Sequence, residues 1–413
     1  MNFKKIIEQK DAFADYMVDE ITKIIKTCGK RSPGSEGEKK SCDYMAKVLK
    51  DECGCEDVKI EPCEVAPKAF YAWVYIVCTF ILISIVCFFF APVIAIPLII
   101  AGFTLTILEF GLYKKALDPF CKKKTSHNVT AIKKCKGEVK RRIIFNGHPD
   151  ATWEWPVNYA LGGVGFEGHA GSVIIGALYF LVISILKVAN NGLSFGTPDM
   201  GDSLTKAGLV GLIFVPFVIG LYFMEDYSRV VDGANDNLTG CYMGISVLKA
   251  LKDEGIELEN TEVGVILTGS EEIGLRGAKA WAEKHAGEFQ DVPTFIYCFD
   301  TINDPKYLMA NYRDLNGTVK SDKDVADLFM EAAKAIDIPC QKGWVPPLGG
   351  ATDSAAFAQG GFRAAGITGL NHKLERYYHT RLDTYTNMNK KGIANCFAAT
   401  VKTLELFDKG AKQ

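Results

Sequence analysis

Two kinds of apolar pattern alternate along most of this chain. Short apolar runs bounded by polar residues predict buried strands at residues 58–65, 142–146, 263–267, 294–299 and 364–368. Longer segments with apolar residues at helical spacing predict helices at residues 3–27, 39–49, 234–254, 275–285, 321–337 and 391–408. This alternation predicts an α/β fold with a mixed, mainly parallel sheet and helices on both of its faces.

A third pattern interrupts the alternation, because long segments carry no charged side chain. The first such segment runs from Ala69 to Leu108, with Pro92 and Pro97 near its middle. Since one crossing of a bilayer needs about 20 apolar residues, the segment predicts two transmembrane helices joined by a tight turn. The alternative, a single buried core helix, would be far shorter.

A second pair of uncharged segments, Ala170–Leu186 and Ala207–Met224, flanks a polar linker. Their lengths are near the lower limit for a span, so a buried or re-entrant pair is the alternative to a second transmembrane hairpin. We therefore expect four transmembrane helices. The predicted division is a discontinuous soluble domain at 1–68, 114–168 and 225–413, a first hairpin at 69–113 and a second hairpin at 169–224.

Charge and composition limit the location and the partners of the chain. Its 413 residues carry a formal net charge of −2, which gives no reason to expect nucleic acid. Lys114, Lys115 and residues 122–124, all lysine, follow the first hairpin, and such basic flanks favour the cytoplasmic side. Both hairpins start and end on that side, so we expect a multi-pass membrane protein whose soluble domain is cytoplasmic. The thirteen cysteines lack paired spacing, which fits a reducing compartment, and the charged N-terminus does not look like a signal peptide.

Residues with metal-binding side chains collect where the predicted strands end. The carboxyl ends of parallel strands meet at one edge of a sheet, and ligands bind at that edge. Imidazole and carboxylate groups without thiolate suit catalytic zinc or a similar divalent metal. Each residue alone could instead be a solvated carboxylate or a hydrogen-bonded histidine. The residues at predicted strand ends are His148, Asp150, Asp236, Glu271, Glu272 and Asp300. To this set we add His379, from the segment 377–384.

These residues stand in an ordered series of motifs. The series is Gly-His-x-Asp at 147–150, Gly-Ala-Asn-Asp-Asn at 233–237, Gly-Ser-Glu-Glu-x-Gly at 269–274, Asp300 at a strand end, and Tyr-His-Thr-x-x-Asp-Thr at 378–384. It resembles the two-zinc exopeptidase family of secreted bacterial leucine aminopeptidases, glutamate carboxypeptidases and glutaminyl cyclases. Residues 31–38, 128–129 and 350–357 look like further landmarks of that family. The resemblance covers nearly all of the chain outside the hairpins and implies a zinc-aminopeptidase-like fold.

The resemblance implies a set of metal ligands. His148 is expected to bind one zinc ion and His379 the other, although another divalent metal could take their place. Asp236 is expected to bridge the two ions. Glu272 and Asp300 are each expected to complete the coordination of one ion.

The resemblance also implies roles for two carboxylates that bind no metal. Glu271 is expected to act as the general base. Asp150 is expected to orient His148, because histidines that bind a metal commonly donate their other ring nitrogen to a carboxylate. A cis peptide bond after the bridging aspartate, between Asp236 and Asn237, is a further family trait to look for.

Two features depart from the family pattern. The second hairpin separates His148 from Asp236, which are usually close in sequence, and Trp153-Glu154-Trp155-Pro156 has no familiar counterpart. Because the linkers around this hairpin are short, we expect the metal site to open near the bilayer. A role for the hairpins as simple anchors is the alternative.

The predicted function is a membrane-anchored two-zinc amide hydrolase, an aminopeptidase that removes N-terminal residues from peptides. Other enzymes of the same kind are open as alternatives: a hydrolase of N-acyl amino acids or other lipophilic, amphiphilic amides, or a glutaminyl cyclase. A catalytically dead membrane receptor or scaffold is the alternative outside enzymes, and a protein of that kind typically loses ligands or the base. The oligomeric state is open.

Overall fold

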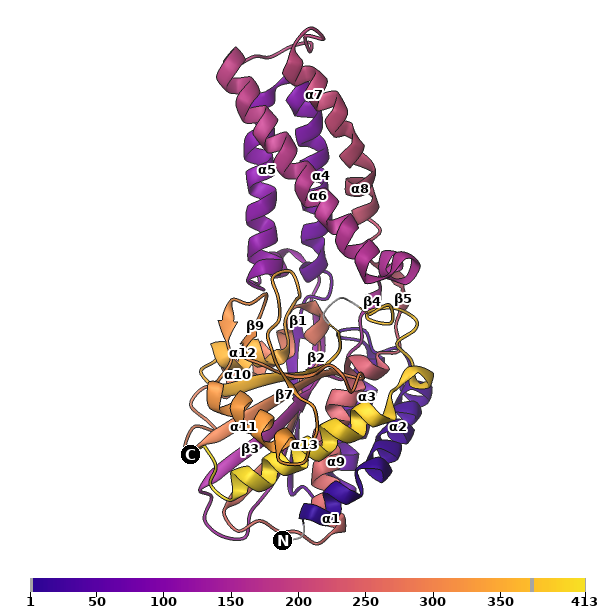
Figure 1. Cartoon of the computed structure of the whole chain (residues 1–413), viewed down its shortest axis with the longest axis vertical. Coiled ribbons are helices and arrows are strands. Elements are labelled where there is room, and N and C mark those ends of the chain that lie inside the picture. The colour runs from indigo at the N-terminus through magenta and orange to yellow at the C-terminus, as the bar shows by residue number, and fades with distance from the viewer. Residues whose placement is uncertain (1–2, 372–374, 413) are drawn as a thin grey trace. The chain divides into compact units, whose positions relative to one another are not determined.

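The computed structural model describes residues 3–371 and 375–412 (Figure 1). The chain divides into two compact units. We call the first, residues 1–67, 122–154 and 228–413, the α/β unit, and the second, residues 68–121 and 155–227, the helical unit. The predicted division into a discontinuous soluble domain and two hairpins stays a prediction.

The α/β unit is built on a mixed sheet with the strand order β1-β2-β6-β3-β7-β12-β8-β11. Strands β6, β3, β7 and β12 run parallel, whereas β1, β2 and β8 each join the sheet through antiparallel pairing. The predicted fold class is therefore confirmed. The strands are β1 (Asp57–Val65), β2 (Lys124–Lys133), β6 (Thr261–Leu267), β3 (Arg141–Gly147), β7 (Thr294–Ile302), β12 (Arg363–Gly369), β8 (Leu308–Asn311) and β11 (Gln341–Gly343).

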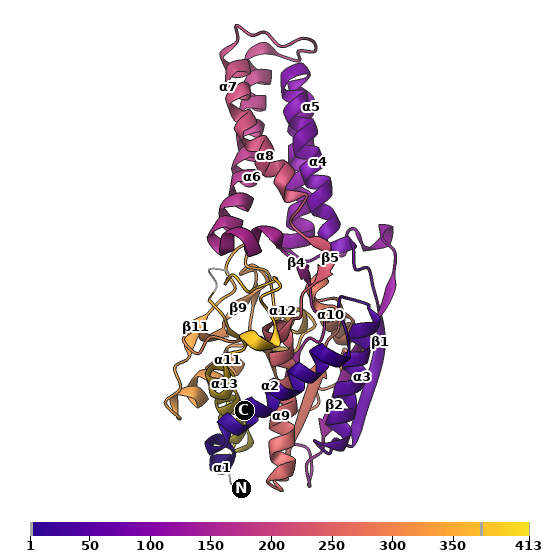
Figure 2. The same ribbon diagram turned by 90° about the vertical axis from the view of Figure 1, so that its right-hand side faces the viewer.

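Helices cover both faces of this sheet (Figure 2). One face and its helices share a large apolar core, in which Phe145 and Phe299 of the central strands meet Phe329 and Phe397 of the helices. The helices on this face are α1 (Phe3–Glu8), α2 (Lys10–Thr27), α3 (Glu36–Asp51), α9 (Thr239–Asp253), α11 (Lys323–Lys334) and α13 (Lys390–Asp408). The other face packs against α10 (Arg276–Lys284) and α12 (Asp353–Gln359). Because the central strands are buried on both faces, they appear in the sequence as continuous apolar runs.

The register of the parallel strands brings their carboxyl ends together. Gly147 at the end of β3 pairs with Leu267 at the end of β6, and Thr368 near the end of β12 pairs with Asp300 in β7. Residues that follow β3 and β6 therefore reach the same edge of the sheet as Asp300. This is the edge at which the sequence predicted a metal site.

Short strands outside the main sheet complete the α/β unit. They are β4 (Trp153–Glu154) paired with β5 (Asp226–Val230), and β9 (Arg313–Asp314) paired with β10 (Val319–Lys320). The sequence did not predict these strands, or β8 and β11, because runs of two to five residues carry too little periodicity.

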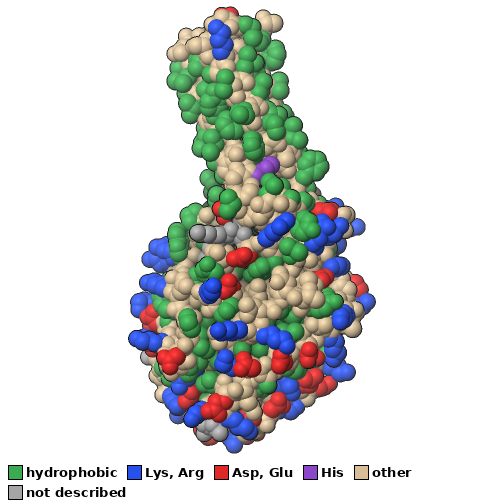
Figure 3. Space-filling view, turned by 45° about the vertical axis from the view of Figure 1, so that its right-hand side comes forward, with side chains coloured by type: hydrophobic (Ala, Val, Ile, Leu, Met, Phe, Trp, Pro, Cys, Tyr) green, Lys and Arg blue, Asp and Glu red, His purple; other side chains and the backbone are tan. Residues whose placement is uncertain are grey.

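The helical unit contains long apolar helices. It comprises α4 (Ala69–Phe90), α5 (Pro92–Thr106), α6 (Pro156–Asn191), α7 (Ser203–Gly211) and α8 (Val215–Leu221). Within the described residues, four helices are long and apolar enough to cross a membrane: Ala69–Phe90, Pro92–Gly111, Pro156–Asn191 and Ser203–Leu221. Phe88, Phe180 and Val218 pack in the interior of the bundle. Hydrophobic side chains also cover much of its visible surface (Figure 3). Among the hydrophobic residues of this unit, Val86 and Val210 are 59% and 72% exposed. Such a surface fits a lipid environment.

Helix α6 begins earlier than the sequence predicted. It starts at Pro156, well before the expected Ala170, and its backbone breaks at Gly162, with φ of 70°. The uncharged stretch could not reveal this start, because Glu167 lies in the helix and is exposed.

Candidate metal centre

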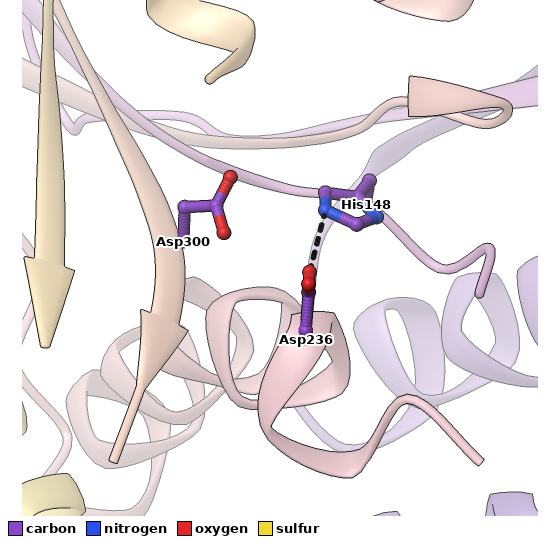
Figure 4. A group of neighbouring side chains, drawn as sticks. All are labelled: His148, Asp236 and Asp300. Carbon is purple, nitrogen blue, oxygen red and sulfur yellow. Dashed lines mark ion pairs between the residues drawn. The ribbon is translucent and has the colours of Figure 1, made fainter. Parts of the chain in front are cut away.

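Two groups of side chains that could hold a metal ion lie at the carboxyl edge of the sheet, among the described residues. The first group is His148, Asp236 and Asp300, whose ligand atoms all lie within 4.8 Å of one another (Figure 4). His148 follows β3, Asp300 lies in β7, and Asp236 lies in the turn that starts α9. The second group is Asp236, Glu272 and His379.

Asp236 belongs to both groups, and each of its carboxylate oxygens faces a different histidine. Its Oδ1 lies 3.4 Å from His148 Nε2, and its Oδ2 lies 3.1 Å from His379 Nε2. His379 Nε2 also lies 3.3 Å from Glu272 Oε2. This is the geometry that a carboxylate needs in order to bridge two ions.

The donor set fits a divalent metal. It consists of imidazole and carboxylate groups, and neither group contains a cysteine among the described residues. Four buried carboxylates, from Asp236, Glu271, Glu272 and Asp300, crowd around two histidines. Burial, followed by the charge of Asp236, raises the pKa of Asp300 to about 8. Burial also raises the pKa of Glu271 and of Glu272 well above the ordinary value. Divalent cations would relieve this crowding of negative charge.

Glu271 lies outside both groups, within the part of the chain that the structure describes. Its Oε2 is 3.6 Å from His148 Nε2, and the residue is only 8% exposed. It is therefore a buried carboxylate beside the two candidate ligand groups that belongs to neither of them.

Asp150 connects the two halves of the centre. Its carboxylate lies 3.4 Å from His148 Nδ1. It also accepts hydrogen bonds from the backbone N–H groups of Glu271 and Glu272, each at 3.1 Å. The sequence suggested only the first of these contacts. Asp150 thus contacts both His148 and the turn that carries both glutamates.

Asp383 holds the turn that contains Asp236. It accepts hydrogen bonds from the backbone N–H of Asn235 at 2.8 Å and of Asp236 at 3.1 Å. The Asp236–Asn237 peptide bond is cis, as the family resemblance suggested. Sequence reasoning missed Asp383 as a supporting residue, although it lies in the motif that contains His379.

Glu38 and Asp353 are further buried carboxyls that the sequence did not single out. Glu38 accepts hydrogen bonds from Ser270 Oγ and from the Gly34 N–H, both at 2.9 Å. Asp353, the first residue of α12, accepts a hydrogen bond from Thr268 Oγ1. Burial raises the pKa of Glu38 to about 8 and that of Asp353 to about 7. Both residues lie in the landmark segments 31–38 and 350–357, which were the only signal for them.

Known proteins share this fold. A zinc aminopeptidase from Bacillus subtilis matches over 95% of this chain and 94% of its own, with 13% identity and a TM-score of 0.55. An aminopeptidase from Aneurinibacillus sp. strain AM-1 matches over 98% and 95%, with 15% identity and a TM-score of 0.56. A glutaminyl cyclase from Porphyromonas gingivalis matches over 97% of each chain, with 10% identity and a TM-score of 0.52. No curated protein matches the sequence.

A match to a peptidase family, together with the zinc aminopeptidase fold, defines a hydrolase of the metallopeptidase class. Residues 220–404 match the model of peptidase family M28. The recognised family and the predicted enzyme class are therefore confirmed. The matched range contains Asp236, Glu271, Glu272, Asp300 and His379, whereas His148 and Asp150 precede it.

Proposed function

We propose that this protein is a membrane-anchored two-zinc aminopeptidase that removes N-terminal residues from peptides. The observation that carries the proposal is the position of Asp236, whose two carboxylate oxygens each face a histidine from a different ligand group. A single-ion site would need only one such group. The match to a peptidase family supports amide hydrolysis as the reaction.

In this proposal His148, Asp236 and Asp300 hold one ion, and Asp236, Glu272 and His379 hold the other. Zinc bound there would polarise the scissile carbonyl and lower the pKa of an attacking water. Asp150 keeps the His148 ring oriented through its contact with Nδ1. The burial of the ligands keeps bulk water away from their side chains.

Glu271 is the proton carrier in this mechanism. It takes the proton from the attacking water at its carboxylate and returns it to the nitrogen of the leaving amine. Burial holds the pKa of Glu271 well above the usual carboxyl value.

Substrate class is tested by a panel assayed on the full-length protein in detergent micelles. The panel contains aminoacyl amides, N-acyl amino acids and peptides with N-terminal glutamine, and the first two are offered with short and with long alkyl chains. We expect hydrolysis of the aminoacyl amides, which need a free amine. Exclusive turnover of N-acyl amino acids would identify an N-acyl amino acid hydrolase instead of an aminopeptidase. Cyclisation of the glutaminyl peptides would identify a glutaminyl cyclase.

The alkyl-chain arm tests whether substrates reach the centre from the bilayer. If they do, kcat/KM rises with chain length for the same head group, because apolar contacts and local concentration both favour the longer amide. Equal kcat/KM across chain lengths would indicate that the hairpins serve only as membrane anchors.

The membrane proposal rests on the four apolar helices and on the lysines that follow the first hairpin. It can be tested by labelling cells with a membrane-impermeant thiol reagent. Cys241 and Cys298 are buried and cannot serve, but Cys121 and Cys135 are partly exposed. We expect these two to be labelled only after permeabilisation.

The matched control for this labelling is Thr197→Cys, in the exposed linker between α6 and α7. Because this linker joins the far ends of the second hairpin, the introduced cysteine should react in intact cells. The reverse pattern, with Cys121 and Cys135 labelled and residue 197 protected, would invert the proposed orientation.

A further inference from the structure

An ion pair with a buried carboxylate involves the loop that carries His379, which we define as residues 377–383. Glu154 of β4 is fully buried, and it accepts three hydrogen bonds from Arg381: from the backbone N–H at 3.0 Å, from Nε at 2.6 Å and from Nη2 at 2.5 Å. Arg229 lies 3.4 Å from the same carboxylate. The acceptor comes from the Trp-Glu-Trp-Pro segment at 153–156, which the family resemblance left without a role.

The backbone of His379 is in an unfavourable conformation. Its φ is +54°, in the left-handed region that residues other than glycine seldom occupy. Such a conformation persists only when the surrounding structure imposes it from several directions. The contacts of the loop should therefore show what imposes it.

Among the contacts that restrain the loop around His379, three bear on its conformation. Thr380 Oγ1 donates a hydrogen bond to the Tyr377 carbonyl at 3.0 Å, within the loop itself. Asp383 ties the far end of the loop to the backbone of Asp236. Arg381 ties its middle to Glu154, only two residues after His379. The last two contacts anchor the loop to separate parts of the α/β unit.

We propose that Glu154 and Arg381 are positioning residues whose ion pair imposes the left-handed conformation of His379 and so places its imidazole beside Asp236 and Glu272. The inference rests on the proposed zinc function. Without the Arg381 anchor, the described contacts that hold the loop from outside lie at its far end, where Asp383 bonds to Asp236 and Thr384 bonds to Asp232. The segment between residues 378 and 382 would then have more freedom, and the His379 ring could move out of the second ligand group. With both anchors in place, its Nε2 stays 3.1 Å from Asp236 and 3.3 Å from Glu272.

The character of the pair also favours a restraining role. The Glu154 side chain is only 1% exposed, so water cannot replace Arg381 as its partner, whereas the Arg381 side chain is 41% exposed. Three hydrogen bonds from one residue fix both the backbone and the side chain of Arg381. An ion pair that acted only on solubility would not require a buried Glu154 carboxylate or a hydrogen bond from the Arg381 backbone N–H.

The test measures zinc affinity of the full-length protein by competition with a chelator, together with kcat and KM. The variants are Glu154→Gln, Arg381→Gln, Arg381→Lys and the double variant Glu154→Gln/Arg381→Gln. The matched control is Glu262→Gln, which disrupts another buried pair, Glu262 with Arg142, at the opposite end of β3.

We expect Glu154→Gln and Arg381→Gln each to lower zinc affinity by about 10–100-fold, the range found for residues that orient metal ligands. The double variant should lose no more than the worse single variant, because the two residues act as one unit. Arg381→Lys keeps the backbone bond and the charge and should lose less than Arg381→Gln. In the same variants kcat should fall while KM changes little, because the ion pair places a ligand and does not touch the substrate.

Zinc affinities within threefold of the wild type for both single variants would overturn the inference, as would an equal loss in Glu262→Gln. If Glu154→Gln does not fold, the zinc affinity of Arg381→Gln decides the test. The Arg381 side chain is half-exposed, so replacing it leaves no cavity in the core. Failure of the proposed function is recognised separately, because the wild-type protein would then bind no zinc or hydrolyse no amide.

Discussion

Glu271→Gln is expected to lower kcat by roughly 10²–10⁴-fold while the protein keeps its zinc. The substitution removes a proton acceptor and preserves the size of the side chain, and Glu271 lies outside both ligand groups among the described residues. The measurement compares kcat and bound zinc in the variant and the wild type.

The neighbouring residue provides the matched control for this prediction. Glu272→Gln removes a carboxylate that belongs to the second ligand group, so it should weaken zinc binding as well as activity. If Glu271→Gln lost zinc and Glu272→Gln kept it, the roles of these two residues would be reversed.

Asp236→Ala is expected to release zinc from both positions and to abolish activity. Asp236 is the one side chain shared by the two ligand groups in the described part of the chain, so its loss removes a ligand from each ion. Bound zinc is counted after gel filtration of the purified variant.

Asp253→Ala controls for a general effect on the same helix. Asp253 is exposed at the other end of α9 and pairs only with Lys249 among the contacts of its side chain that the structure describes. This variant should keep both zinc and activity. An Asp236→Ala protein that still held two zinc ions would remove the basis for the bridging role.

Much of the centre could be predicted from the sequence because its residues lie in or just beyond regular elements. His148 follows β3, Asp300 lies in β7, and Glu271 and Glu272 follow β6. Parallel strands place such residues at one edge of the sheet, so the strand pattern was enough to bring them together. No strand pattern gave a signal for the second histidine, His379, and the resemblance to a family assigned its role as a ligand.

The supporting contacts could not be predicted, because each joins residues far apart in the sequence. Asp383 bonds to the backbone of Asn235 and Asp236, and Glu154 pairs with Arg381. No periodicity or local spacing records such pairings, since they depend on how loops pack once the sheet has formed. The start of α6 at Pro156 was missed for a different reason. A stretch without charged residues marks the apolar core of a transmembrane span, but it does not show where the helix begins.

The position of the second hairpin connects the fold to the proposed function. Residues 155–227 are inserted between His148 and Asp236, which are ligands of the same ion in the proposed centre. The chain therefore enters and leaves the helical unit close in sequence to the metal ligands, at Glu154 on one side and Ser228 on the other. Glu154, which belongs to the α/β unit, also pairs with Arg381 in the loop that carries the other histidine.

The most direct test of the two-zinc centre is the zinc content of the full-length wild-type protein, measured by elemental analysis on the same sample as its amide hydrolase activity. We predict two zinc ions per chain, loss of activity when a chelator removes them, and recovery when zinc is returned. A protein that hydrolyses amides at full rate without bound divalent metal, or that binds no zinc under any loading condition, would contradict the proposal.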